Sequence, residues 1–428
     1  MLIQFTTGNF RSFLDPKILS MEATSITDFP ENLYKSKRLK LNKCAGIYGA
    51  NSSGKSNFLQ AMGTMKDTLF ESFEQSSASS LSYDPFSLKV NNKEPSFFEA
   101  VFMINDTKYR YGFEIDDQTI HGEWLFETEK IKENPLFIRV KDGIQVFKHF
   151  KEGVGLEDKT RLNALFLAVV DQFNGEKSKK ILEWFKQLNV IDGISHNNYR
   201  GVTFKMLENE ETKIPLTEFF HDLDLGFESI KVTKELFDAN KMLPGLPEDI
   251  VKKIVTDMEG ETVINLTSLH KTFDDNFEFI STMKEFNVRR QESSGTNKII
   301  DLSGPIFDTL NSGGVLVIDE LDAKFHPLLT LSVLRLFQSE KTNKNNAQLI
   351  FATHNTNILG LGRLRRDQIY FTEKDKFGIT DLYSLVEYNM KGKKVRKDNT
   401  FEKDYIKGKY GAIPNIGDLN NLEIKWQE

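Results

Sequence analysis

Gly49-Ala50-Asn51-Ser52-Ser53-Gly54-Lys55-Ser56 fits the pattern Gly-x-x-x-x-Gly-Lys-Ser/Thr at every fixed position. Glycines at this spacing let the backbone wrap closely around phosphate oxygens and aim several N–H groups at them. The lysine of this pattern reaches the β- and γ-phosphates, and the hydroxyl after it ligates Mg²⁺. A chance match in a chain of this length is expected on the order of once in a hundred chains. The stretch therefore predicts a phosphate-binding loop, with Lys55 and Ser56 in those two roles.

The residues on either side of the loop support this prediction. Residues 43–48 form a short apolar run that is typical of a buried strand, and Phe58, Leu59, Met62, Met65 and Leu69 follow at helical spacing. The helix that begins near Gly54 would add the positive end of its dipole to the loop. A strand before the motif and a helix after it are the setting in which this motif binds phosphate.

A second apolar run, residues 315–318, ends in the acidic pair Asp319 and Glu320. Carboxylates directly after a buried strand are expected at its carboxyl end, which is the edge where open α/β sheets bind ligands. Asp319 would hold Mg²⁺ from its second shell, and Glu320 would polarise the attacking water. The alternative is a solvated strand end followed by an acidic helix start. The complete phosphate loop favours the catalytic interpretation.

Two further segments have a functional and a structural interpretation. The apolar run 348–353 ends in His354, which could bond a terminal phosphate and sense its presence, or simply cap the strand. The turn Ser293-Ser294-Gly295-Thr296 precedes a helical stretch. It is either a second anion site or an ordinary helix N-cap.

The remaining chain divides into three parts by texture. Aromatic, alternating runs between residues 97 and 126 predict an antiparallel meander. Residues 151–285 carry more charge and helical spacing, with extended pieces expected near 203–207 and 228–232. From about 286 onward short buried strands alternate with helices again. We therefore expect one α/β domain made of 1–150 and 286–428, interrupted by a mainly helical insertion at 151–285.

Composition limits the class of protein. The chain has 428 residues, 39% of them hydrophobic, a net charge of −6 and a single cysteine, Cys44. An internal disulfide is therefore impossible, which fits a reducing, cytoplasmic setting. No uncharged apolar run approaches the roughly 18 residues that span a bilayer. The composition therefore predicts neither a disulfide-rich secreted protein nor a membrane protein, and no membrane partner is expected.

Five features of the sequence, taken in order, carry a family resemblance. They are Asn9-Phe10-Arg11-Ser12-Phe13, the loop with Asn51 and the trailing Lys55-Ser56-Asn57, Ser293-Ser294-Gly295-Thr296, Asp319-Glu320-Leu321-Asp322 with His326-Pro327, and Thr353-His354. With these features the chain resembles the ATPase heads of the ABC type found in SMC, RecF and OLD proteins, and more narrowly the stand-alone bacterial AAA family ATPases of the abortive-infection type (AbiLi- and RloA-like). The run Gly408–Pro414 is similar to a C-terminal element of that narrower group. The resemblance leaves residues 150–285 largely uncovered.

This resemblance implies an α/β fold, an ABC-ATPase head that combines a mixed sheet with an antiparallel β subdomain. It implies ATP and Mg²⁺ as ligands and a head-to-head homodimer with two ATPs at the interface. Glu320, Lys55 and His354 would be catalytic, and Ser56 and Asp319 would serve the metal. Each ATP would contact Gly49, Asn51, Ser52, Ser53, Gly54, Lys55, Ser56, Asn57 and Arg11 of one subunit. Ser293 and Gly295 of the other subunit would reach the γ-phosphate, and Asp322 would lie in the loop that crosses the interface.

Two departures from the family pattern stand out. The signature carries Glu292 and Ser294 in place of the usual Leu–Ser–Gly–Gly form. A Q-loop glutamine has no clear position, although Gln75 lies in the right general stretch. Only 74 residues follow His354 (428 − 354), without an Asp-x-Asp pair, so we expect no C-terminal TOPRIM nuclease. The toxic activity of the system would then belong to a separate effector protein, such as a nuclease or toxin.

Three functions remain open from the sequence. The first is a dimeric ATPase that senses infection, through a nucleic acid or a phage component, and controls an effector in antiphage defence. The dimer leaves the insertion free for higher oligomers. The second is a RecF-like DNA-repair ATPase that acts directly on DNA, and the third is a module that holds ATP without turnover. The basic clusters 363–366 and 391–397 are either solvated faces or nucleic-acid contacts.

Overall fold

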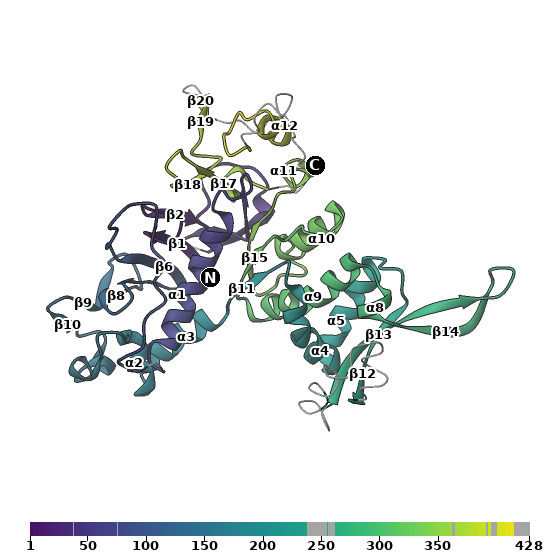
Figure 1. Ribbon diagram of the computed structural model, residues 1–428, viewed down its shortest axis with the longest axis horizontal. Helices are drawn as coiled ribbons and strands as arrows, with labels where there is room; N and C mark the ends of the chain where they lie inside the picture. Colours follow the sequence, from purple (N-terminus) through teal and green to yellow (C-terminus); the bar gives the residue numbers. More distant parts are fainter. Residues whose placement is uncertain are drawn as a thin grey trace, which may run out of the picture. The chain divides into compact units, whose positions relative to one another are not determined.

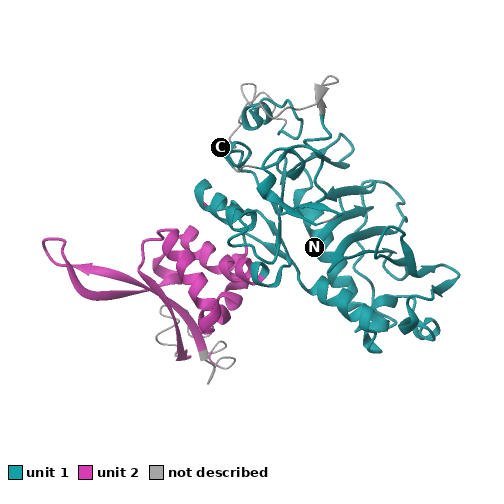
Figure 2. Cartoon of the chain, turned by 180° about the vertical axis from the view of Figure 1, so that it is seen from behind, with its two compact units in different colours: residues 1–194, 309–323, 327–428 teal, residues 195–308, 324–326 magenta. Residues whose placement is uncertain are grey.

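The computed structural model describes residues 1–36, 38–74, 76–237, 255, 262–361, 364–390, 393–394 and 400–414. The chain forms two compact units (Figure 2). Unit 1 comprises Met1–Ile194, Thr309–Ala323 and Pro327–Glu428, and unit 2 comprises Ser195–Asp308 and Lys324–His326. Gln75, Arg363 and most of the cluster 391–397 lie outside the described residues.

A six-stranded sheet forms the centre of unit 1 (Figure 1). Its order is β11-β15-β16-β5-β17-β18, and every neighbouring pair is parallel except β17 with β18. The strands are β5 (Cys44–Tyr48), β11 (Leu188–Asp192), β15 (Val315–Asp319), β16 (Gln348–Ala352), β17 (Ile369–Lys374) and β18 (Thr380–Ser384). All five residues of β5 are buried, as expected for a strand covered on both faces.

Helices of unit 1 alternate with these strands along the chain. They are α1 (Lys55–Glu71), α2 (Phe166–Gln172), α3 (Glu176–Lys186), α10 (Pro327–Gln338), α11 (Asn357–Leu361) and α12 (Phe401–Ile406). Of these helices, α1, α3 and α10 contact strands of the sheet. Helix α1 packs against β1, β11, β15 and β16 through its apolar positions, among them Phe58 and Met62. The spacing of those positions predicted this helix from the sequence, and the structure confirms it.

The second layer of unit 1 is a seven-stranded antiparallel sheet with the order β10-β9-β8-β7-β6-β1-β2. Its strands are β1 (Leu2–Gly8), β2 (Lys17–Ser20), β6 (Ser96–Ile104), β7 (Thr107–Ile115), β8 (Ile120–Thr128), β9 (Asn134–Val140) and β10 (Gly143–Val146). Phe98, Phe102 and Tyr111 of this sheet belong to the same hydrophobic core as Phe58 of α1. The predicted meander is confirmed, and the fold is mixed α/β as expected.

Unit 1 also contains two small ladders and several single turns of 3₁₀ helix. The ladders pair β3 (Leu33–Lys35) with β4 (Lys40–Asn42), and β19 (Asn389–Met390) with β20 (Lys393–Lys394). The turns are η1 (Pro30–Asn32), η2 (Lys151–Gly153), η3 (Glu157–Lys159) and η5 (Arg366–Gln368).

Unit 2 combines helices with a three-stranded antiparallel sheet of order β12-β13-β14. Its elements are η4 (His196–Tyr199), α4 (Arg200–Glu208), α5 (Glu210–Asp222), β12 (Ser229–Leu236), β13 (Thr262–Phe273), β14 (Phe279–Asn287), α8 (Val288–Gln291) and most of α9 (Ser294–Ser312). The expected extended piece near 228–232 is confirmed as part of β12. The piece expected near 203–207 is wrong, because these residues lie in α4.

A buried ionic network holds the helices of unit 2 together. Asp301 of α9 has a fully buried side chain, and its carboxylate pairs with His196 Nδ1 at 2.8 Å and Arg200 Nε at 2.5 Å. Arg200 also donates to Asn297 Oδ1 at 3.0 Å, and the Asn297 amide donates to the Ser293 carbonyl at 3.1 Å. A buried carboxylate is tolerated because several donors satisfy it, so this network fixes α4 against the start of α9.

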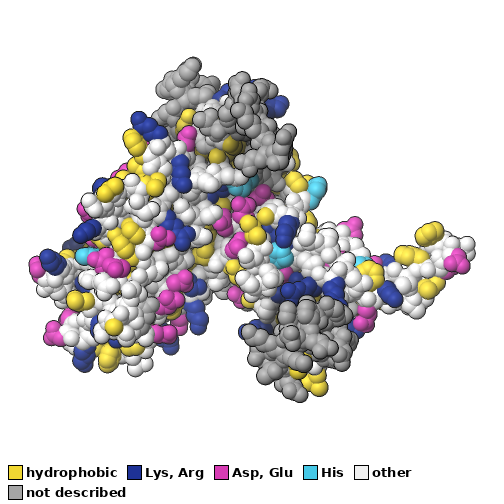
Figure 3. Space-filling view, in the orientation of Figure 1, with side chains coloured by type: hydrophobic (Ala, Val, Ile, Leu, Met, Phe, Trp, Pro, Cys, Tyr) yellow, Lys and Arg dark blue, Asp and Glu magenta, His cyan; other side chains and the backbone are white. Residues whose placement is uncertain are grey.

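Beyond its base, the hairpin of β13 and β14 exposes large apolar side chains (yellow on the right of Figure 3). Phe273, Phe277, Phe279, Ile280 and Met283 are each between 44% and 86% exposed. The hairpin is one of the features that make unit 2 more than a helical insertion.

The unit boundaries differ from the expected ones. Residues 151–194, expected in the insertion, lie in unit 1, whereas 286–308, expected in the head, lie in unit 2. The reason is pairing that the change in texture near residue 150 did not show. Strand β11 pairs with β15 in the central sheet, and the N–H groups of Phe166 and Leu167 at the start of α2 donate to buried Glu123 of β8. Among the described residues, no helix combines the length and apolar character needed to cross a membrane.

Candidate nucleotide-binding site

The loop between β5 and α1 has the backbone geometry that phosphate binding requires. Gly54 has φ +108°, a region that favours glycine, and a Cβ there would lie 2.5 Å from Thr380 Oγ1. A Cβ on Gly49 would lie 2.5 Å from Ser53 Oγ. The two glycines at the fixed positions of the motif are therefore the residues that the tight path of the loop demands.

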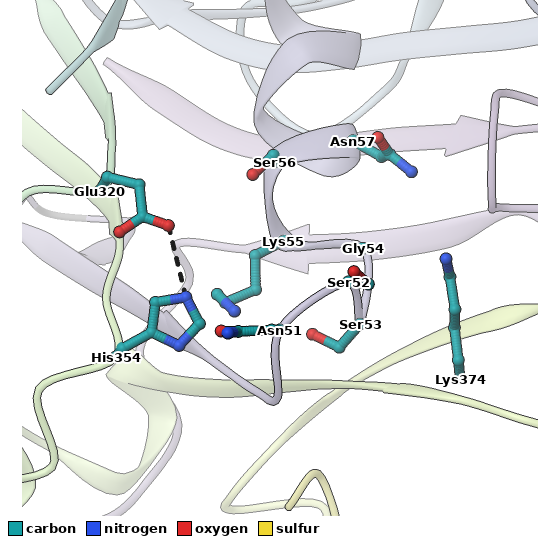
Figure 4. A pocket seen from close by; sticks show the side chains of 10 residues that line it. All are labelled: Asn51, Ser52, Ser53, Gly54, Lys55, Ser56, Asn57, Glu320, His354 and Lys374. Atoms are coloured by element: carbon teal, nitrogen blue, oxygen red, sulfur yellow. Dashed lines mark ion pairs between the residues drawn. The ribbon is translucent and has the colours of Figure 1, made fainter. Parts of the chain in front are cut away.

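Helix α1 begins at Lys55, and the residue at its N-cap position, Gly54, makes no side-chain capping hydrogen bond. The first N–H groups of a helix lack partners within the helix, so this end offers several donors and the positive end of a dipole. The donors lie at a cavity of about 480 Å³. Asn51, Ser52, Ser53, Gly54, Lys55, Ser56, Asn57, Glu320, His354 and Lys374 line it (Figure 4).

Lys55 is held inside the loop. Its Nζ donates to the carbonyls of Gly49 and Ala50 at 2.9 and 3.0 Å. Burial lowers the pKa of Lys55, and the carboxylates of Glu320, Asp319 and Asp322 act in the opposite direction. These acidic neighbours keep a cation favourable at a buried position, which suits a group that faces phosphates.

The acidic pair lies at the carboxyl end of β15, as the sequence predicted. Burial raises the pKa of Asp319, and a hydrogen bond from the Ser56 side chain lowers it. Ser56 and Asp319 are therefore in direct contact, which is the arrangement that would hold a Mg²⁺ ion together with phosphate oxygens and water. The two oxygen-bearing side chains fit a hard cation of this kind.

Glu320 occupies a strained turn directly after the strand. Its φ is +53°, which is uncommon for a residue other than glycine and is often found at functional sites. Its Oε1 lies 3.3 Å from Nε2 of His354, at the end of the neighbouring strand β16 (Figure 4). The backbone N–H of His354 donates to Asp322 Oδ1 at 3.3 Å. The structure thus brings Glu320, Asp322 and His354 together. Glu320 and His354 line the same cavity as Lys55, although they are far from Lys55 in the sequence.

Three residues assigned from the resemblance lie elsewhere. Arg11 pairs with Asp84 at 2.7 Å and bonds Gln60, and it is not among the described residues that line the cavity. Ser293 and Gly295 lie in unit 2. The Ser293 hydroxyl accepts the Thr296 N–H at 3.0 Å, so Ser293 caps α9, which is the structural interpretation of this turn.

The C-terminal segment lines a second cavity, of about 870 Å³, that shares Asn51, Ser52, Ser53, His354 and Lys374 with the first. Ala412, Ile413 and Pro414 belong to its wall. The sequence similarity of residues 408–414 to a family element therefore concerns a segment beside the phosphate loop.

The basic cluster at 363–366 is neither a solvated face nor a docking surface at its centre. Arg365 is fully buried, pairs with Asp367 at 2.9 Å and donates to the carbonyl of Ile26. Arg366 pairs with Asp28 at 2.8 Å. Both arginines serve the packing of unit 1.

Four further residues surround the loop, namely Ser12, Thr372, Lys374 and Thr380. The sequence revealed Ser12 only as part of the match at Asn9–Phe13, and it did not reveal the other three. Ser53 Oγ lies 2.6 Å from Thr372 Oγ1, and Asn57 donates to Ser12 Oγ at 2.8 Å. Thr380 donates to the Ser53 carbonyl at 3.0 Å. Thr372 and Lys374 belong to residues 369–374, and nothing in that stretch of sequence indicates that it forms the strand next to β5.

A comparison with known families shows which family the chain belongs to. Residues 44–360, more than half of the 428 residues, match the family described as "AAA domain, putative AbiEii toxin, Type IV TA system". The chain belongs to this AAA-domain family. None of the curated proteins compared with the chain matches it. AAA domains generally bind ATP with Mg²⁺ and hydrolyse it. The match begins at β5 and ends in α11, so it spans every segment that carries the cavity except Lys374.

Proposed function

We propose that this AAA-domain protein binds ATP and Mg²⁺ in the cavity of unit 1 and hydrolyses the ATP. The observation that supports this best is that the phosphate loop and the ends of β15 and β16 meet at the start of α1. Ser56, which bonds Asp319, lines the same cavity as Lys55, and so do both members of the Glu320–His354 pair. A phosphate-binding loop, a metal-binding pair and a base beside it are the parts that phosphoryl transfer to water requires.

Each side chain has a definite task in this proposal. The loop N–H groups and Lys55 bind the phosphates, and Ser56 and Asp319 hold the metal. Mg²⁺ would neutralise charge on the phosphate oxygens. Glu320 accepts a proton from the attacking water while the oxygen bonds to the γ-phosphorus, and the bond to the β–γ bridging oxygen breaks to release ADP. His354, 3.3 Å from Glu320, orients that carboxylate.

Two variants test this assignment. Lys55→Ala should abolish ATP binding, because it removes the cation inside the loop. Glu320→Gln should retain binding, because the shape is kept, and should lower turnover by about 10²–10⁴-fold, the usual contribution of a general base. Equilibrium binding and steady-state phosphate release measure the two effects. Normal hydrolysis by Glu320→Gln would show that another group is the base.

We further propose that the nucleotide state controls a separate effector in antiphage defence. The family's description names an abortive-infection toxin and a toxin–antitoxin system, which supports such a setting. The resemblance to ABC-type heads adds a homodimer in which Ser293 and Gly295 reach the ATP of the partner subunit and Asp322 lies at the interface. Co-expression with the product of the neighbouring gene, followed by phage challenge, tests the role in defence. Protection that persists in Lys55→Ala would disconnect the ATPase from it.

A further inference from the structure

The cavity contains a second cation that no motif predicts. Lys55 is engaged by two carbonyls of the loop. Lys374, by contrast, is exposed and lines the same cavity, and in the described part of the chain no ion pair or hydrogen bond engages its ammonium group. An ammonium group beside an anion site and without a carboxylate partner is available to a ligand.

The pairing of β17 explains why Lys374 reaches the loop. Strand β17 runs parallel to β5, with Phe371 opposite Tyr48, so its carboxyl end lies beside the phosphate loop. Thr372 faces the loop, since its Oγ1 lies 2.6 Å from Ser53 Oγ. Side chains two residues apart in a strand share a face, so Lys374 faces the loop as well. Glu373 faces the other way, and its carboxylate accepts from Tyr383 at 3.3 Å.

Lys374 and the Glu320–His354 pair lie on opposite sides of the loop. In Figure 4 the pair stands to one side of Lys55, and Lys374 stands to the other, on the side of Asn57. A bound triphosphate runs along the loop, and its γ-phosphate must lie at the end with the base. The cation at the far end then faces the part of the phosphate chain that remains after hydrolysis.

We propose that Lys374 is a nucleotide-binding residue that contacts the phosphates retained in ADP. This inference rests on the proposed ATPase function and adds a residue to it. Lys374 increases the affinity for ATP and ADP alike and takes no part in the cleavage of the γ-phosphate. It is separate from Lys55, which serves the β- and γ-phosphates.

The test compares Lys374→Ala with a control lysine two residues on. Lys376 is exposed, and its Nζ lies 4.9 Å from the centre of the Phe377 ring, outside the lining of either cavity. Lys374→Ala should weaken ATP and ADP binding equally, by about tenfold, which is the usual size of one charge-assisted contact. KM for ATP should rise with kcat retained, Lys374→Arg should restore affinity, and Lys376→Ala should match the wild type.

The outcomes separate this inference from the proposed function. If Lys374→Ala binds both nucleotides as tightly as the wild type, Lys374 is an ordinary solvated lysine and the inference fails while the ATPase stands. If only ATP binding weakens, Lys374 contacts the γ-phosphate and the proposed position is wrong. If the wild type binds neither nucleotide, the proposed function itself fails. The difference between variant and wild type should shrink as salt is raised, because an exposed contact is screened.

Discussion

At the scale of single residues, the cavity depends on backbone positions as much as on charged groups. Gly54 has φ +108°, and a Cβ there would lie 2.5 Å from Thr380 Oγ1 and 3.0 Å from Ser12 Oγ. Both hydroxyls support the loop, since Ser12 accepts from Asn57 and Thr380 donates to Ser53. A side chain at this position would therefore displace the contacts that set the loop's shape.

Gly54→Ala should abolish ATP binding and cost about 1–3 kcal/mol of unfolding free energy, from the strained backbone and the displaced hydroxyls. Gly63→Ala is the matched control. Gly63 lies inside α1, and its Cβ would meet nothing nearer than Val190 at 3.7 Å. That variant should keep ATP binding and gain about 0.5–1 kcal/mol, because alanine favours a helix. Calorimetry measures ATP binding by the two variants, and urea unfolding measures their stability. Equal effects of the two substitutions would show that Gly54 has no special place in the loop.

Local spacing in the sequence was enough to predict the loop residues, because the motif encodes a path of only eight residues. Asp319, Glu320 and His354 were predictable because each ends a buried apolar run. Lys374 was not, since its place depends on β17 pairing with β5, and nothing in residues 369–374 states that partner. Arg365 was misinterpreted for a related reason, because its partner Asp367 and the carbonyls around it become a buried site only in the fold.

At the scale of elements, unit 2 depends on one buried carboxylate. Asp301 joins η4, α4 and α9 through His196 and Arg200. Asp301→Ala leaves the half-buried guanidinium of Arg200 without its main partner, so unit 2 should lose about 3 kcal/mol of stability. The exposed Asp222, with an 84% exposed side chain, provides the control Asp222→Ala, which should change stability by less than about 0.5 kcal/mol.

Chemical denaturation would measure the loss of stability, and hydrogen exchange at α4 and α9 would locate it. An Asp301→Ala protein as stable as the wild type would mean that the network contributes no net stability. The same network shows why residues 203–207 were misassigned. Val202, Thr203 and Phe204 favour strands locally, but within α4 Thr203 donates to the Ile300 carbonyl at 2.9 Å and packs on Gly304. These contacts with α9 are tertiary, and the local sequence does not show them.

At the scale of the whole molecule, the proposed homodimer makes a distinct prediction. Glu320→Gln should accumulate as an ATP-bound dimer, because the nucleotide that joins the subunits is not hydrolysed. Ser293→Arg should prevent the dimer, since a bulky cation would occupy the proposed trans contact, while unit 1 retains its affinity for ATP. Sedimentation velocity with ATP and Mg²⁺, and with EDTA as a metal-free control, measures the mass. An unchanged monomer of Glu320→Gln under all conditions would contradict the dimer.

The split of the chain into two units was predictable only in outline. The return of buried strands after residue 286 correctly indicated that distant segments share one sheet, as β5, β15 and β16 do. The first boundary depended in part on β11, a five-residue strand, Leu-Asn-Val-Ile-Asp, that closely follows helix α3 in the chain. Short strands of this kind are identified by their partners, and the partner here, β15, lies more than a hundred residues away in the chain.

The single cysteine has a practical consequence. Cys44 lies in the fully buried strand β5, and burial raises the pKa of its thiol well above the usual range. Maleimide and similar reagents attack thiolates, so the native protein should remain almost unlabelled. A cysteine introduced at an exposed position, such as Phe277 on the hairpin of unit 2, would then carry a dye without background from the rest of the chain. The wild-type background therefore already suits fluorescence measurements of how the units respond to nucleotide.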